Sequence, residues 1–65
     1  MANYTNMIWE LYAEYEDGTV IDETRAYDNS KTESEQQYDL ECELIEENYY
    51  SFGDCTNYSV TLVYD

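Results

Sequence analysis

Apolar and polar residues alternate near both ends of the chain, with the period of two that is typical of β-strands. Residues 7–15 form the first such run, and residues 57–64 form the second. In each run the larger apolar residues share one face, which predicts strands that pack one face against a core. The shared-face residues are Trp9, Leu11, Ala13 and Tyr15 in the first strand and Tyr58, Val60, Leu62 and Tyr64 in the last.

A hairpin is predicted after the first strand, because Asp17-Gly18 separates two β-rich runs. As a two-residue type I′ loop, this dipeptide would join the first strand to a second strand over residues 19–27. The resulting register places Glu10, on the face opposite Trp9, across from Arg25. Its other cross-strand pairs are Tyr15 with Val20, Leu11 with Thr24 and Trp9 with Ala26.

The polar segment that follows contains overlapping helix-start signals, in which Ser or Thr precedes Glu or Gln by three residues. These pairs are Ser30 with Glu33, Thr32 with Glu35 and Ser34 with Gln37. They predict a helix over residues 31–48, with Gly53 shortly after its end. On that helix one stripe would contain Tyr38, Cys42, Ile45 and Tyr49. Residues 49–56 are predicted to form a loop.

Residues 38–44 also fit a strand, because apolar and acidic residues alternate there. Glu, Gln and Leu are good helix formers and the start signals are redundant, which favours the helix. The element order is then β-β-α-β. We therefore expect a single domain over residues 1–65 of the α+β class, a small antiparallel sheet with one helix packed on a face.

The net charge is the most unusual property of the sequence. The 65 residues include 16 Asp and Glu against two Lys and Arg, which gives a formal net charge of −14. A small soluble domain usually carries a net charge of about 2–8 in magnitude, and a larger excess destabilises the compact state by self-repulsion. An aromatic content of 17% argues against a disordered acidic segment. A merely solvated acidic surface and a surface that binds a basic partner are both compatible with this charge.

The predicted helix carries a row of carboxylates four residues apart, at intervals of about 6 Å along its axis. Duplex DNA presents one negative charge per about 1.7 Å of axis, so such a row can contact some of the same Lys and Arg side chains as phosphates do. The hairpin adds further carboxylates near its turn. The candidate partner-binding residues are Glu35, Asp39, Glu43, Glu46 and Glu47 on the helix and Glu14, Glu16, Asp17, Asp22 and Glu23 on the hairpin.

Catalytic and metal chemistry have few residues to draw on. The chain contains no His, which removes the commonest general base near neutral pH and the commonest transition-metal ligand. Its two glycines, Gly18 and Gly53, do not form a phosphate-binding loop. An EF-hand loop aligned on Gly18 would place Ala13, Tyr15 and Thr24 at ligand positions, and all three are wrong for the motif. We expect no enzymatic activity, no cofactor and no metal site.

In size, acidity and hairpin-plus-helix outline, the chain resembles the small acidic phage proteins that disarm bacterial defence, especially the anti-CRISPR DNA mimics. The likeness covers the whole chain but includes no diagnostic motif, so no residue roles are carried over from it. The resemblance implies blocking of the DNA-binding or PAM-reading site of a CRISPR–Cas effector in a bacterial host. If exposed, Tyr12, Tyr49, Tyr50 and Tyr58 could stack on Arg guanidiniums of such a partner, around the charged contacts. The alternative is a small phage structural or interaction protein that binds through an aromatic surface of exposed Tyr and Trp, without DNA mimicry.

The expected compartment is the cytoplasm of the bacterial host cell. The N-terminal residues 1–4 lack the basic and apolar regions of a signal peptide, and no apolar run approaches the ~20 residues that span a bilayer. Cys42 and Cys55 are then expected as reduced thiols rather than as a disulfide. The expected partner is a basic DNA-binding protein, with no direct binding to nucleic acid or membrane and with a monomer favoured over a dimer.

Overall fold

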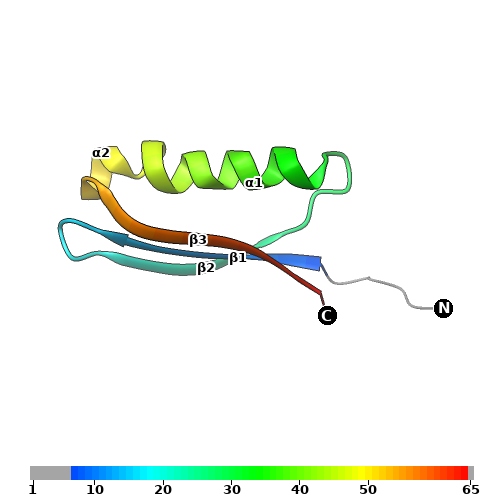
Figure 1. Cartoon of the computed structure of the whole chain (residues 1–65), viewed down its shortest axis with the longest axis horizontal. Coiled ribbons are helices and arrows are strands. Elements are labelled where there is room, and N and C mark those ends of the chain that lie inside the picture. The colour runs from blue at the N-terminus through cyan, green and yellow to red at the C-terminus, as the bar shows by residue number, and fades with distance from the viewer. Residues whose placement is uncertain (1–6, 65) are drawn as a thin grey trace.

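The computed structural model of the protein describes residues 7–64, which form a three-stranded sheet and a helical segment (Figure 1). The strands are β1 (Met7–Tyr15), β2 (Val20–Ala26) and β3 (Cys55–Tyr64). The helical segment consists of α1 (Glu33–Cys42), the π-helical turn η1 (Glu43–Glu47) and the short helix α2 (Tyr49–Phe52). The N-terminal residues on which the expectation about a signal peptide depends lie outside the described residues.

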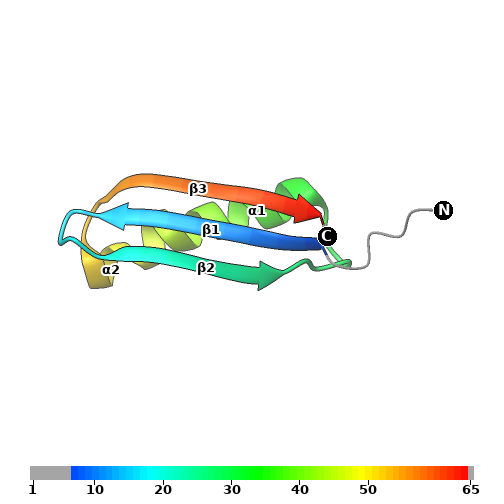
Figure 2. The same ribbon diagram turned by 90° about the horizontal axis from the view of Figure 1, so that it is seen from below.

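The sheet is antiparallel, and β1 lies in its centre between β2 and β3. The helical segment covers one face of the sheet, while no described element covers the other (Figures 1 and 2). It runs along the length of the sheet and returns the chain to the hairpin end, where β3 begins. The predicted fold, an α+β domain with one helix packed on a small antiparallel sheet, is confirmed.

The core lies between β1 and the helical segment. Trp9, Leu11, Ala13 and Tyr15 are buried on one face of β1, as the alternating pattern predicts, and Leu44 of η1 is buried against them. Each large apolar side chain buried in this way contributes about 1.5–3 kcal/mol. The central strand is the most buried strand because β2 and β3 shield its two edges and the helix shields its inner face.

The hairpin loop contains three residues, so the predicted two-residue type I′ loop is wrong. The Tyr15 amide donates to the Thr19 carbonyl (2.9 Å) and closes a loop over residues 16–18. Gly18 donates its amide to the Tyr15 carbonyl (2.9 Å) and has a φ of 94°, the left-handed conformation typical of the last position of a three-residue loop. Asp17 Oδ1 accepts from the Thr19 amide (2.8 Å), which further stabilises this loop.

The longer loop shifts the register of β2 by one residue. The predicted pairs Tyr15–Val20, Leu11–Thr24, Trp9–Ala26 and Glu10–Arg25 are therefore wrong. The observed pairs include Trp9–Arg25, Glu10–Thr24, Leu11–Glu23 and Ala13–Ile21. A one-residue shift moves every side chain of a strand to the other face of the sheet. Ile21 consequently packs against the core, and Val20, Thr24 and Ala26 lie on the uncovered face.

Helix α1 begins at one of the predicted start signals. The Thr32 hydroxyl accepts from the Glu35 amide (3.2 Å), and the Glu35 carboxylate accepts from the Thr32 amide (3.1 Å). This reciprocal cap places the first helical residue at Glu33 rather than at residue 31. Residues 38–44 are helical, so the helix interpretation of their ambiguous pattern is confirmed and the strand alternative is wrong.

The face of the helix that packs on the sheet is not the predicted stripe. Gln36 and Leu44 are buried, and Leu40 between them is half-buried. Of the predicted stripe, Cys42 is half-buried, and the exposed members are Tyr38, Ile45 and Tyr49. Gln36 lies on this inner face although it is polar, because its Oε1 accepts a hydrogen bond from Trp9 Nε1 (3.0 Å). A buried indole N–H usually has such an acceptor.

The π-helical turn η1 is joined to the sheet through Tyr15. The Asn48 amide donates to the Glu43 carbonyl (3.1 Å), one residue earlier than in an α-helix. The Leu44 carbonyl, which an α-helix would offer to Asn48, instead accepts from the Tyr15 hydroxyl (2.7 Å). That hydroxyl also accepts from Asn48 Nδ2 (3.1 Å).

The predicted loop over residues 49–56 is wrong in most of its length, because α2 occupies its first half and β3 begins at Cys55. Gly53 ends α2 with a φ of 84°, as its predicted place after the helix requires. Cys42 and Cys55 are free thiols. Within residues 7–64, no helix has both the length and the apolar character needed to cross a membrane.

Candidate partner-binding surface

The helix carboxylates predicted to form a binding row are largely engaged within the protein. Glu35 belongs to the cap of α1. Asp39 lies 3.4 Å from Lys31 Nζ, and Glu43, which is half-buried, lies 2.5 Å from Arg25 Nη2. These three carboxylates therefore already have donors within the protein, and a partner would have to compete with those donors. The remaining members of the predicted helix set, Glu46 and Glu47, are exposed.

Both cationic side chains lie beside the helical segment. Arg25 is opposite Trp9 in the sheet, so its side chain points to the helix-covered face. There its guanidinium pairs with Glu23 (2.7 Å) and with Glu43, which links β2 to η1. The hydrogen bond that Arg25 donates to Glu23, with the negative charges of Glu43 and Glu23, raises the pKa of Arg25. Lys31 forms an ion pair with Asp39 of α1.

The uncovered face of the sheet carries carboxylates and neither of these cations. Glu10, Tyr12 and Glu14 alternate with the buried row of β1, and Asp22 of β2 lies opposite Tyr12. The Tyr12 hydroxyl donates to the Glu14 carboxylate. This hydrogen bond, together with desolvation and the negative charges of Glu14 and Asp22, raises the pKa of Tyr12. The face therefore has a negative potential at its centre.

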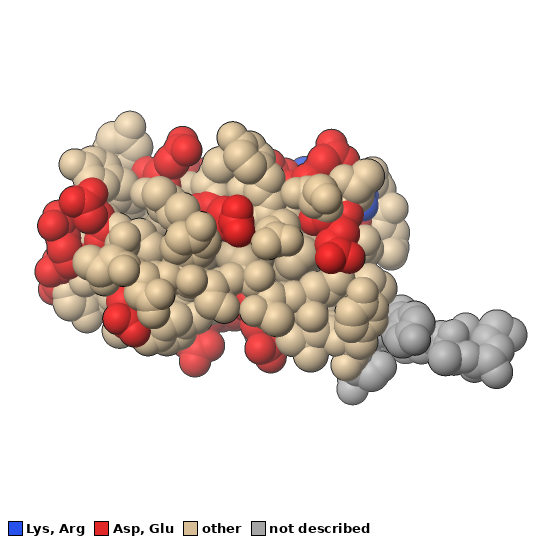
Figure 3. Space-filling model, in the orientation of Figure 1, with Lys and Arg blue, Asp and Glu red and all other residues tan. Residues whose placement is uncertain are grey.

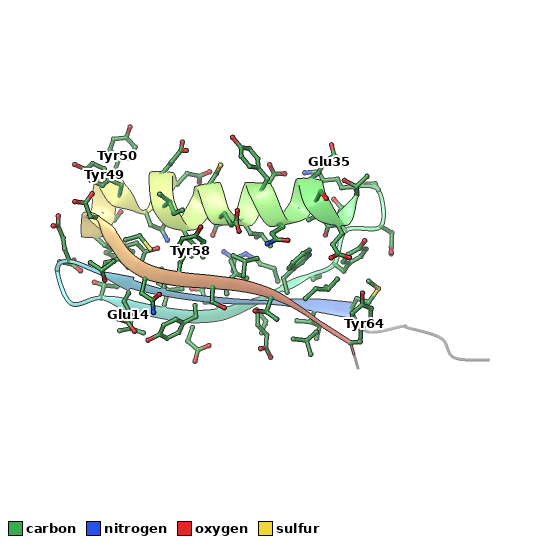
Figure 4. The ribbon with its side chains drawn as sticks, in the orientation of Figure 1. Glu14, Glu35, Tyr49, Tyr50, Tyr58 and Tyr64 are labelled. Carbon is green, nitrogen blue, oxygen red and sulfur yellow. The ribbon has the colours of Figure 1, made fainter. Side chains whose placement is uncertain are left out.

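The hairpin end continues this charge. Glu16 and Asp17 are exposed in the loop directly after β1. Figure 3 shows carboxylates gathered at the hairpin end and below the sheet, apart from those over the helix. Figure 4 shows Glu14 on the side of the sheet away from the helix, and Glu35 beyond the helix. The acidic residues of the uncovered face, called here the open-face surface, are Glu10, Glu14 and Asp22.

The structure thus divides the predicted binding residues into separate groups. Glu14 and Asp22 lie on the open-face surface. Glu16 and Asp17 lie in the hairpin loop, where the Glu16 side chain approaches Gly53 after α2. Glu23 lies on the opposite, helix-covered face because of the shifted register. The five helix residues, Glu35, Asp39, Glu43, Glu46 and Glu47, belong to the other layer of the fold.

Glu10 is the residue that the sequence-based site omitted. The predicted register placed it across from Arg25, which would have neutralised it. In the structure it lies opposite Thr24 and Thr61 and is exposed. The signal that would have identified it is the alternation along β1, which puts Glu10 and Glu14 on the same face whatever the register of β2.

The candidate tyrosines are divided between the two faces. Tyr12 is half-buried on the open-face side, where it contacts Glu14. Tyr49 and Tyr50 pack edge to face at α2, with Tyr50 87% exposed. Tyr58 extends from β3 on the helix side of the sheet and is 42% exposed (Figure 4).

Known proteins give no direct guide to this surface. No protein family, curated protein or solved structure matches the chain. Among residues 7–64, no group of three or more Cys, Asp or Glu side chains is placed to hold a metal ion. Function is therefore inferred from the charge and geometry of the residues.

Proposed function

We propose that this protein is a DNA-mimic inhibitor, which occupies the nucleic-acid site of a basic DNA-binding protein and catalyses no reaction. The observation that carries the proposal is the separation of charge. The charged side chains on the uncovered face of the sheet are all carboxylates, while Arg25 and Lys31 are both paired beside the helical segment. The partner we propose is a CRISPR–Cas effector in the cytoplasm of a bacterial host, whose DNA-binding channel is positively charged.

The spacing of the carboxylates supports contact with several cationic side chains at once. Glu10 and Glu14 are four residues apart on one strand, which separates them by about 13 Å. Asp22 lies on the neighbouring strand, about 5 Å to the side, near the middle of that interval. These carboxylates would therefore take the places of only some phosphates of a DNA strand, because they lie farther apart than successive phosphates do. Association with a basic groove would be fast and would weaken strongly as salt rises.

Charge reversal on the two layers tests the proposal. A Glu10→Lys plus Glu14→Lys variant and a Glu46→Lys plus Glu47→Lys control each change the net charge from −14 to −10, since each reversal adds two positive charges. Wild-type protein immobilised at low salt should capture a DNA-binding protein from bacterial lysate and release it to short duplex DNA. The open-face variant should lose this capture, and the helix control should keep it. Circular dichroism verifies that both variants are folded.

A plaque assay extends this test to the proposed partner. Expression of the wild-type protein and of the helix control should let phage plaque on a strain whose CRISPR–Cas system targets that phage. The open-face variant should not. Equal protection by both variants, or capture that duplex DNA does not reverse, would show that the open-face carboxylates do not mimic DNA.

A second function has a specific observation in its favour. Tyr38, Tyr49 and Tyr50 are exposed on the helical segment, where a folded domain of this size could have buried some of them. Exposed aromatic residues support a small phage structural or interaction protein that binds through an aromatic surface. In that case Tyr49→Ala plus Tyr50→Ala would abolish partner capture, and capture would change little with salt.

A further inference from the structure

Strand β3 differs from the rest of this acidic protein because none of its ten residues is charged. It lies at one edge of the sheet, and no element of the described chain lies beyond it (Figure 2). Proteins usually protect an exposed edge with charges, proline or a bulge, because unpaired backbone groups there can bind another strand. Strand β3 has a bulge only at its start, between Cys55 and Asn57, whereas the opposite edge, β2, carries Asp22, Glu23 and Arg25.

The register shows which backbone groups of β3 face outward. The Tyr27 amide donates to the Met7 carbonyl, and the Tyr15 amide donates to Thr19. The odd-numbered residues of β1 therefore bond to β2, and the even-numbered ones bond to the odd-numbered residues of β3. The even-numbered residues of β3 direct their amides and carbonyls away from the sheet. In the regular part of the strand these residues are Tyr58, Val60 and Leu62.

We infer that the edge of β3 is a docking site for an extended segment of a basic partner, which adds to the sheet as a fourth strand. Main-chain hydrogen bonds from such an added strand supply affinity, and its alternate side chains supply specificity. The inference rests on the proposed function only for the basic character of the partner.

The open face of β3 allows the positive charge of a docked strand to reach the acidic surface. Thr61 lies opposite Glu10 and Asn57 lies opposite Glu14, with Ser59 between them. A docked strand would lie two strand spacings from β1, or about 10 Å. Lys and Arg have long flexible stems, and these small polar residues of β3 leave room for such a stem to approach Glu10 or Glu14.

The helix side of β3 selects a different kind of side chain. Tyr58, Val60 and Leu62 point to that side, and the Tyr58 ring is partly exposed there (Figure 4). Alternate residues of a docked strand would contact this apolar border. The edge therefore fits a segment in which basic and apolar residues alternate, with the basic ones over Glu10 and Glu14.

A second copy of the protein fits the same edge poorly. It would bring another net charge of −14 and no cation for Glu10 or Glu14, because its own Arg25 and Lys31 are paired beside its helical segment. Charge complementarity thus favours a basic partner over self-association at β3.

Hydrogen exchange on the full-length, ¹⁵N-labelled protein tests this docking. The probe is a synthetic peptide of alternating Lys and Val, and the control peptide carries Glu in place of Lys. The Lys peptide should slow exchange of the Tyr58, Val60 and Leu62 amides by about tenfold or more, with no effect at Val20 or Thr24 on β2. The Glu peptide should have no effect at either edge.

Proline variants provide a second readout. Tyr58→Pro removes an outward amide from β3, and Thr24→Pro removes one from β2, so neither change breaks a bond to β1. Tyr58→Pro should weaken binding of the Lys peptide by about tenfold or more, and Thr24→Pro should leave it unchanged. Light scattering of the unmixed protein reports self-association.

The outcomes separate this inference from the proposed function. Protection at β2, or full affinity in Tyr58→Pro, would overturn docking at β3, as would a dimer that Tyr58→Pro dissociates. Loss of lysate capture in the open-face variant would still support DNA mimicry in that case. Protection at β3 with undiminished capture by the open-face variant would support docking and overturn mimicry.

Discussion

Gln36 is the residue on which the contact between helix and sheet most depends. Its side-chain carbonyl accepts from Trp9 Nε1 (3.0 Å) and from the Asp28 amide (2.8 Å). Its amide group donates to the carbonyls of Asp28, Lys31 and Thr32. One buried side chain thus joins the core of β1, the connection after β2 and the start of α1. No described buried side-chain nitrogen or oxygen is left without a partner.

Replacing Gln36 by Leu should destabilise the protein by about 2–4 kcal/mol, because the buried Trp9 indole would be left without an acceptor and the partly buried Asp28 amide would also lose its acceptor. That is a large share of the roughly 3–10 kcal/mol expected for a domain of this length. Urea unfolding followed by the fluorescence of Trp9, the one tryptophan, measures the change. Gln37→Leu, one residue along and exposed, is the control and should have little effect. Equal losses in both variants would contradict the assigned role.

At this scale the sequence was informative for β1 and misleading for the helix. Alternation alone identified Trp9 and Leu11 as core residues, because a central strand has one face that must be buried. The predicted helix stripe is wrong because it contains only the apolar residues of the pattern. The inner face of the helix instead includes Gln36, which accepts the hydrogen bond of the buried Trp9 indole. A hydrogen bond between residues 27 positions apart leaves no periodic signal in a sequence.

At the scale of elements, the length of the hairpin loop determines the chemistry of both sheet faces. With a two-residue loop, Arg25 would lie beside Glu10 on the uncovered face. With the observed three-residue loop, Arg25 lies on the other face with Glu23 and Glu43. Asp-Gly favours a two-residue loop, but it also suits the longer one, whose last position takes a left-handed Gly. The dipeptide therefore predicted the hairpin correctly but not its register.

The π-helical turn η1 gives the next prediction, since Tyr15 holds it through the Leu44 carbonyl. Tyr15→Phe should destabilise the protein by about 1–2 kcal/mol, because the Leu44 carbonyl and the Asn48 amide group both lose their partner. Chemical unfolding measures this loss. Tyr12→Phe makes the same change on the same strand at the uncovered face, and its effect should be smaller. A larger effect at Tyr12 would contradict the assignment.

Alkaline pH provides an independent readout of Tyr15. Burial raises the pKa of this phenol above its ordinary value of 10.0, so the folded state keeps the proton after the unfolded chain has released it. The stability that this group contributes is therefore complete below pH 10 and is lost as the pH rises through the higher folded pKa. The urea concentration at the unfolding midpoint of the wild-type protein should therefore fall as the pH rises above 10. The midpoint of Tyr15→Phe should fall less over the same range. An identical decline in both proteins would show that another group is responsible.

At the scale of the whole molecule, two unusual features depend on each other. An uncharged edge strand rich in β-branched and aromatic residues is a risk for aggregation, because it can pair with other copies. A net charge of −14 opposes that pairing without placing any charge on the edge itself. The fold class was predictable because it follows from alternation and capping along the chain. The separation of Arg25 from the uncovered face was not, because the faces on which Arg25 and Asp22 lie depend on a register that one residue of the loop decides.

Salt should move the stability of the fold and the affinity of its complex in opposite directions. Screening weakens the mutual repulsion of the carboxylates, so raising NaCl from about 0.02 M to about 0.5 M should stabilise the isolated protein. A gain of 1 kcal/mol corresponds to a rise in Tm of about 4–8 °C for a domain of this size, which calorimetry resolves. The Glu46→Lys plus Glu47→Lys variant, with a net charge of −10, should show a smaller rise. Partner binding should weaken over the same range, because the same screening reduces the attraction between the open-face surface and a basic groove. A complex that strengthens with salt in parallel with Tm would show that salt acts by stabilising the binding-competent fold, and that carboxylate contacts do not hold the complex together.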